Sequence, residues 1–370
     1  MELVEVTEGA TSLLVPVQDA SLQFPPGSAG IFYNRRMELN RDATVLLLSS
    51  IHPSGYLDAM GATGVRGLRV ARECGIPVTI NDKNPEAVAL IRQNADHMHI
   101  PVEVCHADVN VLMSARRFDA VDLDPFGSPA PFVDAATRSA RRYLFMTATD
   151  TAPLCGAHQK AGMRRYFAHP LNTPYHGEVA LRILLGFVVR EAVKYDRGVD
   201  PLFCFSREHF IRLHLQLLAG VRAADRTLSR IGFILQCPNC LYRTEAAGLV
   251  AGSISCEYCG VSLTPIGPLW LGAIQDRTIL KEMQAGLGES VLHTAPVLQK
   301  LLAVLDEELP TSSHYDYHQV AKGMKVSPPP IETVLTRLRE GGHAASRAHY
   351  AGTAIKTDAP LPDLMRAVRG

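Results

Sequence analysis

Short apolar runs alternate with stretches of helical periodicity over the first two hundred residues, and no other feature limits the fold as strongly. The runs predict strands at 56–59, 77–80, 102–105, 119–123 and 143–147. The periodic stretches predict helices at 65–73, 85–95 and about 178–195. Strands that alternate with helices form a mostly parallel sheet covered by helices on both faces. The sequence therefore predicts an α/β fold.

Two further apolar runs, 202–206 and 211–218, follow each other without a helix between them. A connection this short predicts an antiparallel hairpin that closes the sheet. A parallel sheet that ends in such a hairpin is the pattern expected of class I, Rossmann-like methyltransferases.

The first predicted strand ends in an acid and a glycine-rich turn. The glycines Gly61, Gly64 and Gly67 are spaced three apart, as GxxGxxG rather than the GxGxxG of dinucleotide-binding folds. A pyrophosphate needs the close glycine pair that is missing here, whereas S-adenosylmethionine carries no phosphate. The glycines let the backbone approach such a ligand, and Arg66 can face its carboxylate.

Acids also follow the next two strands. Open parallel sheets bind ligands at the carboxyl ends of their strands. Asp82 follows Gly61 by 21 positions, close to the roughly 20 expected for an acid that binds ribose hydroxyls. Asp108 can accept a hydrogen bond from an adenine amino group. Each acid can instead cap a helix, which is the simpler interpretation of one isolated Asp. Three acids around one crevice favour S-adenosylmethionine.

The fourth strand ends in Asp124-Pro-Phe126-Gly. This is ordinary turn chemistry, but an acid followed by proline and an aromatic residue also resembles the motif of amino-group methyltransferases. The exocyclic amine of a purine is a poor nucleophile, because its lone pair is delocalised into the ring. The Asp124 carboxylate can accept a hydrogen bond from that amine and remove its proton without a metal. Phe126 can stack on a base that has left its helix.

Four longer motifs carry a closer resemblance. They are FYNRRMELNRD (32–42), DLDPFGSP (122–129), TATDTAPLCGAH (147–158) and GTAIKTDAP (352–360). The chain resembles the tRNA N2,N2-dimethylguanosine methyltransferases over nearly its whole length. This resemblance implies the successive transfer of two methyl groups from S-adenosylmethionine to N2 of the guanine at tRNA position 26.

The resemblance also implies roles for single residues. Matched position by position, the family's cofactor contacts fall on Arg41, Arg66, Asp82, Ala107 and Asp108. Its catalytic acid falls on Asp124, and the rings that hold the target guanine fall on Phe32 and Phe126.

Simpler interpretations of the first motif remain open. Arg41 and Asp42 can pair with each other at the surface, and Phe32 can be a core ring. Arg35 stands where the family usually has proline. It can contact an RNA phosphate or lie in solvent.

Four of the eight cysteines form a regular pattern. Cys237-Pro-Asn-Cys240 and Cys256-Glu-Tyr-Cys259 are two CxxC pairs separated by fifteen residues. This spacing predicts a tetrahedral zinc ribbon with one structural zinc per chain. Disulfides would be unusual in an intracellular protein, and an iron–sulfur site is typically spaced otherwise.

The predicted domains are a methyltransferase domain over 1–228 and a tRNA-binding domain over 229–370. The second contains the zinc ribbon at about 233–265 and a winged-helix-like module at about 296–358. The module is predicted from helices at 314–326 and 329–340 and a possible hairpin within 343–355. These helices can equally be ordinary packing elements.

Charge and hydropathy limit the partners. The formal net charge is +0, so RNA binding must rest on local clusters such as Arg164-Arg165 rather than on a global positive field. No run of eighteen apolar residues and no signal peptide is present in the sequence. We expect a cytoplasmic protein that binds tRNA, without a membrane and without an obligate protein partner.

Two alternative functions are compatible with these motifs. One is an amino-methyltransferase that acts on a different guanine or on DNA adenine. The other is a zinc-ribbon RNA-binding protein with an inactive methyltransferase fold. The intact acids at the strand ends argue against an inactive fold.

Overall fold

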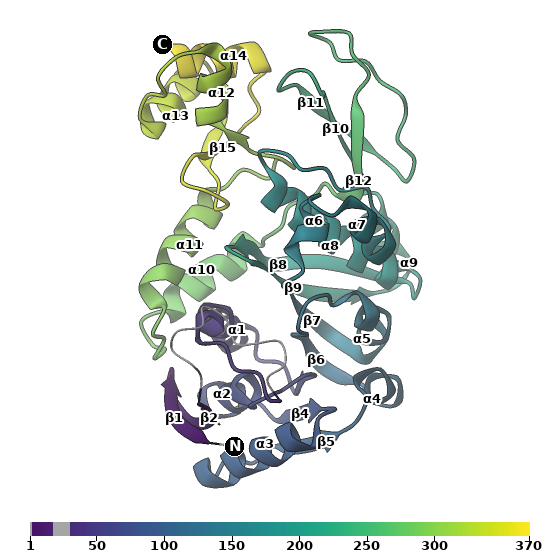
Figure 1. The fold of residues 1–370 in the computed structure, drawn as a ribbon, viewed down its shortest axis with the longest axis vertical. Helices are drawn as coiled ribbons and strands as arrows, with labels where there is room; N and C mark the ends of the chain where they lie inside the picture. Colours follow the sequence, from purple (N-terminus) through teal and green to yellow (C-terminus); the bar gives the residue numbers. More distant parts are fainter. Residues whose placement is uncertain (1, 18–29) are drawn as a thin grey trace. The chain divides into compact units, whose positions relative to one another are not determined.

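The computed structural model describes residues 2–17 and 30–370, and its main feature is a seven-stranded sheet (Figure 1). The strands are β3 (Tyr56–Asp58), β4 (Val78–Asp82), β5 (Glu103–His106), β6 (Phe118–Leu123), β7 (Ala140–Ala148), β8 (Arg197–Arg207) and β9 (Phe210–Ala219). Their order in the sheet is β5-β4-β3-β6-β7-β9-β8. The pairs β3–β4, β3–β6, β4–β5 and β6–β7 are parallel. Two residues join β8 to β9, which makes them an antiparallel hairpin.

The predicted α/β fold with a closing hairpin is confirmed. The helices within the first 150 residues are α1 (Glu38–Ile51), α2 (Val65–Cys74), α3 (Pro85–Met98), α4 (Val109–Ala115) and α5 (Val133–Ser139). Helix α2 packs on β3 and β4, helix α3 packs on β4 and β5, and helix α5 packs on β6. All six residues of β6 are buried, as a strand covered on both faces requires.

The chain divides into two compact units. The first comprises the described residues of Met1–Thr147 together with His214–Leu217 and Arg277–Leu302. It includes an amino-terminal hairpin, β1 (Leu3–Glu8) and β2 (Thr11–Pro16), and helix α10 (Arg277–Gly286), which packs on α1. The sequence predicted no element before residue 55 and did not anticipate that α10 returns to this unit.

The second unit comprises Ala148–Leu213, Leu218–Asp276 and Ala303–Gly370. Its helices before residue 230 are α6 (Thr151–Leu154), α7 (Gln159–Tyr166), α8 (His176–Val193) and α9 (Val221–Leu228). A three-stranded antiparallel sheet follows, made of β10 (Ile231–Gln236), β11 (Arg243–Ala247) and β12 (Thr264–Trp270). The two CxxC pairs lie in the loops that connect these strands, as the zinc-ribbon prediction requires.

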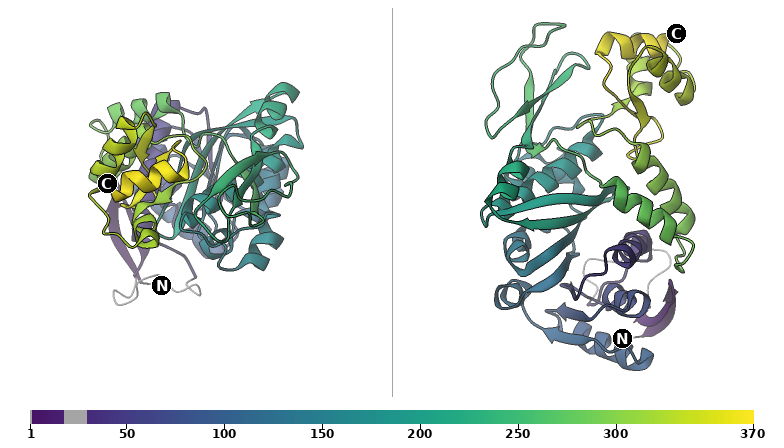
Figure 2. Two further views of the ribbon diagram at one scale, coloured as in Figure 1. Left: turned by 90° about the horizontal axis from the view of Figure 1, so that it is seen from above. Right: turned by 180° about the vertical axis from the view of Figure 1, so that it is seen from behind.

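The carboxyl-terminal part of the second unit is a small helical module. Its elements are β13 (Tyr315–Asp316), α12 (Tyr317–Met324), α13 (Ile331–Glu340), β14 (Ala345–Arg347), β15 (Ala354–Thr357) and α14 (Leu361–Arg369). The strands form one sheet in the order β13-β15-β14. The three helices lie together at the yellow end of the chain in Figure 2. Their shared core includes Val334, Leu338 and Leu364. The predicted helix–turn–helix–hairpin is present, with α14 in addition.

A buried ionic cluster ties this module to α8 within the second unit. Lys356 Nζ lies 2.7 Å from Glu178 Oε1 and 2.9 Å from Glu308 Oε1, and all three residues are at most 2% exposed. His314 and His349 contact the remaining oxygens of Glu178 and Glu308 at 2.9 and 2.7 Å. Lys356 belongs to the GTAIKTDAP motif, so one task of that motif is to place a cation between two buried carboxylates.

The cluster makes stability depend on pH. Burial alone would raise the pKa of Glu308, but the charges of Lys356 and His349 outweigh burial and lower that pKa to about 2. A carboxyl whose pKa is about 4.3 in the unfolded chain then stabilises the fold above that pH, and the contribution is lost as pH falls toward 2. We expect the free energy of unfolding to fall less steeply between pH 5 and pH 3 in Glu308→Gln than in the wild type. Urea unfolding at several pH values measures this, and equal slopes would contradict it.

Among the described residues, no helix has the length and apolar character needed to cross a membrane.

Candidate active site and metal centre

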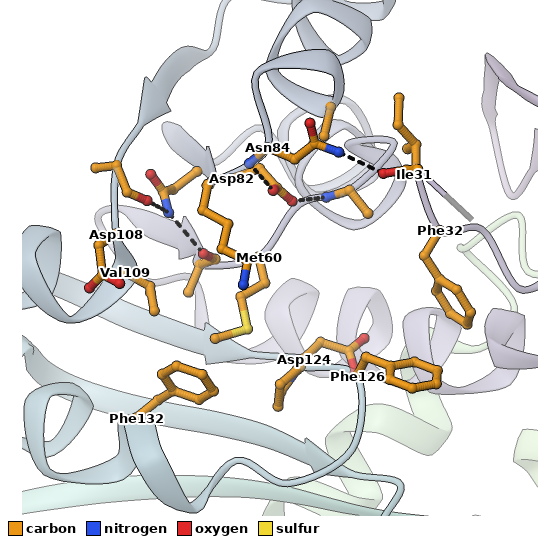
Figure 3. A pocket seen from close by; sticks show the side chains of 18 residues that line it. Ile31, Phe32, Met60, Asp82, Asn84, Asp108, Val109, Asp124, Phe126 and Phe132 are labelled. Carbon is orange, nitrogen blue, oxygen red and sulfur yellow. Dashed lines mark hydrogen bonds between the residues drawn. The ribbon is translucent and has the colours of Figure 1, made fainter. Parts of the chain in front are cut away.

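A cavity of about 430 Å³ opens where β3, β4, β5 and β6 end (Figure 3). Its lining includes five of the residues that the sequence singled out as cofactor or base contacts: Phe32, Asp82, Asp108, Asp124 and Phe126. Ala107 lines it as well, whereas Arg41 and Arg66 do not. The carboxyl ends of parallel strands meet at one edge of a sheet, which is why residues far apart in the sequence converge here.

The glycine-rich turn after β3 packs tightly against β4. Gly64 has a φ of 82°, a conformation that strongly favours glycine. A Cβ atom on Gly67 would come within 2.6 Å of Ile80 Cγ1. In the structure these glycines allow α2 to pack closely on β4. This is a second role, beside the predicted one of letting the backbone approach a ligand.

Asp82 and Asp108 both hold backbone amides at the rim of the cavity. Asp82 accepts hydrogen bonds from the N–H groups of Ala62 and Asn84, at 2.9 and 2.8 Å. Asp108 caps α4, because its Oδ1 accepts from the N–H groups of Asn110 and Val111 at 2.9 and 3.2 Å. The capping interpretation therefore describes Asp108 in this structure, while the residue also faces the cavity.

Asn81 is a cavity residue that the sequence analysis missed. It is 1% exposed, and its Nδ2 donates to the carbonyl oxygens of Ala59 and Ala107 at 3.1 and 3.2 Å. Its Oδ1 is buried without a hydrogen-bond partner in the described structure. A buried acceptor without a partner is costly, so Asn81 Oδ1 is a point where a bound ligand can donate. A polar residue inside the apolar run of β4 was the available signal.

Asp124 is held by a buried arginine. Arg66 is 4% exposed, and its guanidinium contacts Asp124 Oδ2 directly. Arg66 also donates to Asn40 Oδ1 at 2.9 Å and to Thr44 Oγ1 at 3.1 Å. Because both terminal nitrogens of the guanidinium have partners, its position is fixed. The Asp124 carboxylate, which the sequence proposed as the base, therefore has a defined position at the cavity wall.

Further acids lie behind Arg66. Asp122 is fully buried, accepts a hydrogen bond from the Tyr56 hydroxyl at 2.5 Å and lies 3.7 Å from Arg66 Nη1. Burial raises the pKa of Asp58 to about 7, with Asp122 adding to the effect and Arg66 opposing it. Burial would lower the pKa of Arg66, but the surrounding carboxylates raise it. Arg66 is therefore a permanent cation under the floor of the site.

Three phenylalanine rings line the cavity near Asp124. The Phe32 and Phe126 rings meet edge to face, with centroids 5.5 Å apart and an interplanar angle of 68°. Phe126 is 75% exposed, which is unusual for so large an apolar side chain. Phe132, which the sequence analysis did not single out, lies across Asp124 from Phe126 in Figure 3. Phe132 follows a proline in a short 3₁₀ turn, where no periodic pattern marks a ligand-facing ring.

Buried residues of the FYNRRMELNRD motif (32–42) stabilise the cavity wall near Phe32. Arg41 pairs with Glu8, with Nε–Oε2 and Nη2–Oε1 distances of 2.7 and 2.5 Å, and also donates to the carbonyl oxygen of Asn34 at 3.0 Å. Asp42 pairs instead with Arg69 at 2.6 Å. The suggested Arg41–Asp42 surface pair is therefore wrong, since the two residues are buried and have separate partners. Arg35 is exposed.

The four sulfur atoms of the CxxC pairs converge. All four Sγ atoms lie within 4.8 Å of one another, and the Cys237–Cys259 and Cys240–Cys256 sulfur atoms are 3.4 and 3.6 Å apart. Zinc–sulfur bonds of about 2.3 Å give a tetrahedron with edges of about 3.8 Å. The N–H groups of Asn239 and Cys240 point to Cys237 Sγ at 3.4 Å. The donor set thus fits a zinc ion bound by four thiolates.

The comparisons with known proteins agree with this geometry. The family model described as "N2,N2-dimethylguanosine tRNA methyltransferase" matches residues 11–369. The chain belongs to this family. A curated member named tRNA (guanine(26)-N(2))-dimethyltransferase, from Methanoregula boonei, is 64% identical over 370 residues, covering 100% of this chain and 99% of the relative. The member of the same name from Methanoculleus marisnigri is 63% identical, covering 100% of both.

A solved structure of the family has the same fold. Trm1 from Pyrococcus horikoshii, in complex with S-adenosyl-L-methionine, is 34% identical to this chain with a TM-score of 0.89. The match covers 100% of both chains. Both the sheet and the carboxyl-terminal region are therefore features that this chain shares with that structure.

Proposed function

We propose that this protein transfers two methyl groups in succession from S-adenosylmethionine to N2 of the guanine at position 26 of tRNA. The observation that carries this function is the cavity wall where Asp124, held by Arg66, stands beside the exposed ring of Phe126. Membership of the family agrees with it. Because the substrate is tRNA, we place the enzyme in the cytoplasm.

The residues at the strand ends fit S-adenosylmethionine. Asp82 has its carboxylate at the rim where ribose hydroxyls can donate, and Asn81 Oδ1 is a buried acceptor without a partner among the described residues. Ala107 and Asp108 form the part of the wall that follows β5, where we place the adenine. Arg41 does not line the cavity, so we propose that it acts through Asn34, whose backbone it holds, and thereby positions Phe32. S-adenosylmethionine supplies the electrophilic methyl group.

Asp124 is the group that acts on the guanine amine. Its carboxylate accepts a hydrogen bond from the N2 amine, which directs the lone pair out of conjugation with the ring. As a methyl group is added, positive charge develops on N2 and Asp124 removes a proton. Asp124 must release that proton to solvent, and a second S-adenosylmethionine must replace the demethylated cofactor, before the carboxylate holds the monomethylated amine for a second transfer. The contact with Arg66 fixes the carboxylate before the base arrives, so little reorganisation is needed.

The exposed ring of Phe126 receives the flipped guanine. In the structure the Phe32 and Phe126 rings touch and leave no room for a base between them, so the exposed face of Phe126 is the available stacking surface. Stacking there offsets part of the few kcal/mol needed to take a base out of its helix.

Methyl transfer from labelled S-adenosylmethionine tests the substrate class. We expect label in unmodified tRNA and none in a DNA duplex that contains adenine. Label in the DNA alone would identify the rival amino-methyltransferase. Absence of S-adenosylmethionine binding in calorimetry would instead identify the inactive RNA-binding fold.

We also propose that the four-cysteine cluster holds one structural zinc ion, because four thiolates leave no open position for chemistry. Elemental analysis should find about one zinc per chain. Cys237→Ser should lower Tm and weaken tRNA binding more than S-adenosylmethionine binding, whereas Cys74→Ser, a thiol outside the cluster, should retain zinc. A metal-free preparation of full stability would contradict this proposal.

We propose that the two predicted domains have different functions. Residues 1–228 carry the cofactor and the catalytic acid, and residues 229–370 bind tRNA through the ribbon and the helical module. Truncation after residue 228 is a poor test, because α10, from beyond that point, packs on α1 in the first unit. Substitutions in the full chain are therefore the appropriate experiment.

A further inference from the structure

Helix α7 and its carboxyl-terminal cap carry an unusual outward face in the second unit. Lys160, Met163, Arg164 and Phe167 are all exposed. Their spacing of i, i+3, i+4 and i+7 places them in one stripe of the helix. Met163 is 50% exposed and Phe167 is 70% exposed. A solvent-facing stripe that combines two cations with two large apolar side chains does not serve the core.

Phe167 is also held in an unfavourable backbone conformation. Its φ is 47°, in the left-handed region that bulky residues rarely adopt. The ring stacks on the buried ring of Phe187, with centroids 6.5 Å apart and an interplanar angle of 28°. One ring face is thus fixed against the protein while most of the side chain faces solvent. Strained residues of this kind are concentrated at functional sites.

The two cations of the stripe are available to a ligand. Among the described residues, no carboxylate forms an ion pair with Lys160 or Arg164, whereas the neighbouring Arg165 pairs with Asp150 at 2.9 Å. The helix itself is well anchored. The Tyr166 hydroxyl donates to Asp150 at 2.6 Å, and Arg190 donates to the Tyr166 carbonyl oxygen at 2.7 Å. The stripe is therefore held in a fixed position, and neither of its two cations has an ion-pair partner in the part of the chain that the structure describes.

We propose that this α7 stripe is an RNA-binding surface, in which Lys160 and Arg164 contact phosphates and a nucleobase outside a helix stacks on Phe167. The proposal rests on tRNA being the substrate and assigns part of the contact to a specific surface outside the catalytic cavity. RNA offers anionic oxygens and flat apolar faces side by side, which is the combination that the stripe complements. An apolar protein partner would leave both cations without a counter-charge.

Phe167→Asn tests the stacking contact, because asparagine tolerates a positive φ. The loss of one stacked base should weaken tRNA binding by about 5- to 150-fold in filter-binding assays. Tm should stay within about 3 °C of the wild type, since the ring buries little surface. The kcat at saturating tRNA should be unchanged, because the substitution acts on binding.

The double variant Lys160→Ala, Arg164→Ala tests the phosphate contacts. The slope of log affinity against log salt concentration should fall by about 2. The matched control, Arg222→Ala, Arg226→Ala, removes two exposed cations from α9 and should leave the slope nearly unchanged.

Equal losses in both double variants, or wild-type affinity in the Phe167 and Lys160/Arg164 variants, would overturn the proposal. A changed oligomeric state with unchanged tRNA affinity would also overturn it, by assigning the stripe to a second copy of the chain. Failure of the methylation proposal would give a different result. The wild type would then be inactive but would still bind tRNA through this stripe.

Discussion

Replacing Asp124 by asparagine is expected to reduce kcat for guanine methylation by about 10²- to 10⁴-fold, the usual contribution of a positioned general base. Asparagine has nearly the same shape as aspartate and favours turns equally, so the turn after β6 is retained. The amide can still accept a hydrogen bond from the amine, but it cannot take the proton. Single-turnover methylation with saturating S-adenosylmethionine and tRNA measures the effect.

The matched control is Asp96→Asn, an exposed acid on α3, which should keep wild-type kcat. S-adenosylmethionine binding should survive in Asp124→Asn, because Asp82, Asp108 and Asn81 are unchanged. A loss well below 10² would mean that Asp124 mainly orients the amine. Wild-type turnover in a folded Asp124→Asn protein would show that the chemistry lies on another residue.

Replacing Lys356 by methionine should destabilise the protein by about 3–5 kcal/mol. Lys356 lies between the carboxylates of Glu178 and Glu308. Because these residues are buried, water cannot stabilise the two carboxylates when the lysine is removed. Removal of one partner of a buried ionic cluster strands the remaining charges, which is more costly than removal of the whole cluster. Thermal and urea unfolding measure the change.

The reason for this loss can be checked with a second substitution. The double variant Lys356→Met, Glu308→Gln removes one of the stranded charges and should recover part of the stability. Lys322→Met, at an exposed position of α12, should stay close to the wild type. Equal stability of Lys356→Met and Lys322→Met would show that the cluster contributes little.

The sheet and the strand-end acids were predictable because both follow from local patterns. Buried parallel strands appear as short apolar runs, and an acid after such a run must lie at the ligand-binding edge. Asp82, Asp108 and Asp124 are therefore found in the cavity lining. Helix capping was the alternative that the sequence left open for such acids, and Asp108 combines capping of α4 with a place in the cavity lining.

The partners of these residues were not predictable, because they are distant in the sequence. Arg66 and Asp124 are 58 positions apart, and His293 contacts Glu38 across 255 positions. Arg41 was matched to a cofactor contact by resemblance alone, and its buried pairing with Glu8 depends on an amino-terminal hairpin that no periodic pattern predicted. Phe132 acquires a ligand-facing position only from the folded shape, whereas Asn81 was marked by its polarity within the apolar run of β4.

Nucleoside mass spectrometry of tRNA after incubation with the purified protein and S-adenosylmethionine tests the central claim most directly. The tRNA is an unmodified transcript with guanine at position 26, and the control transcript carries adenine there. We expect N2,N2-dimethylguanosine in the first transcript, preceded by the monomethylated nucleoside at early times, and neither in the second. Only unmodified guanosine in the first transcript, or dimethylguanosine in the control, would contradict the proposed function.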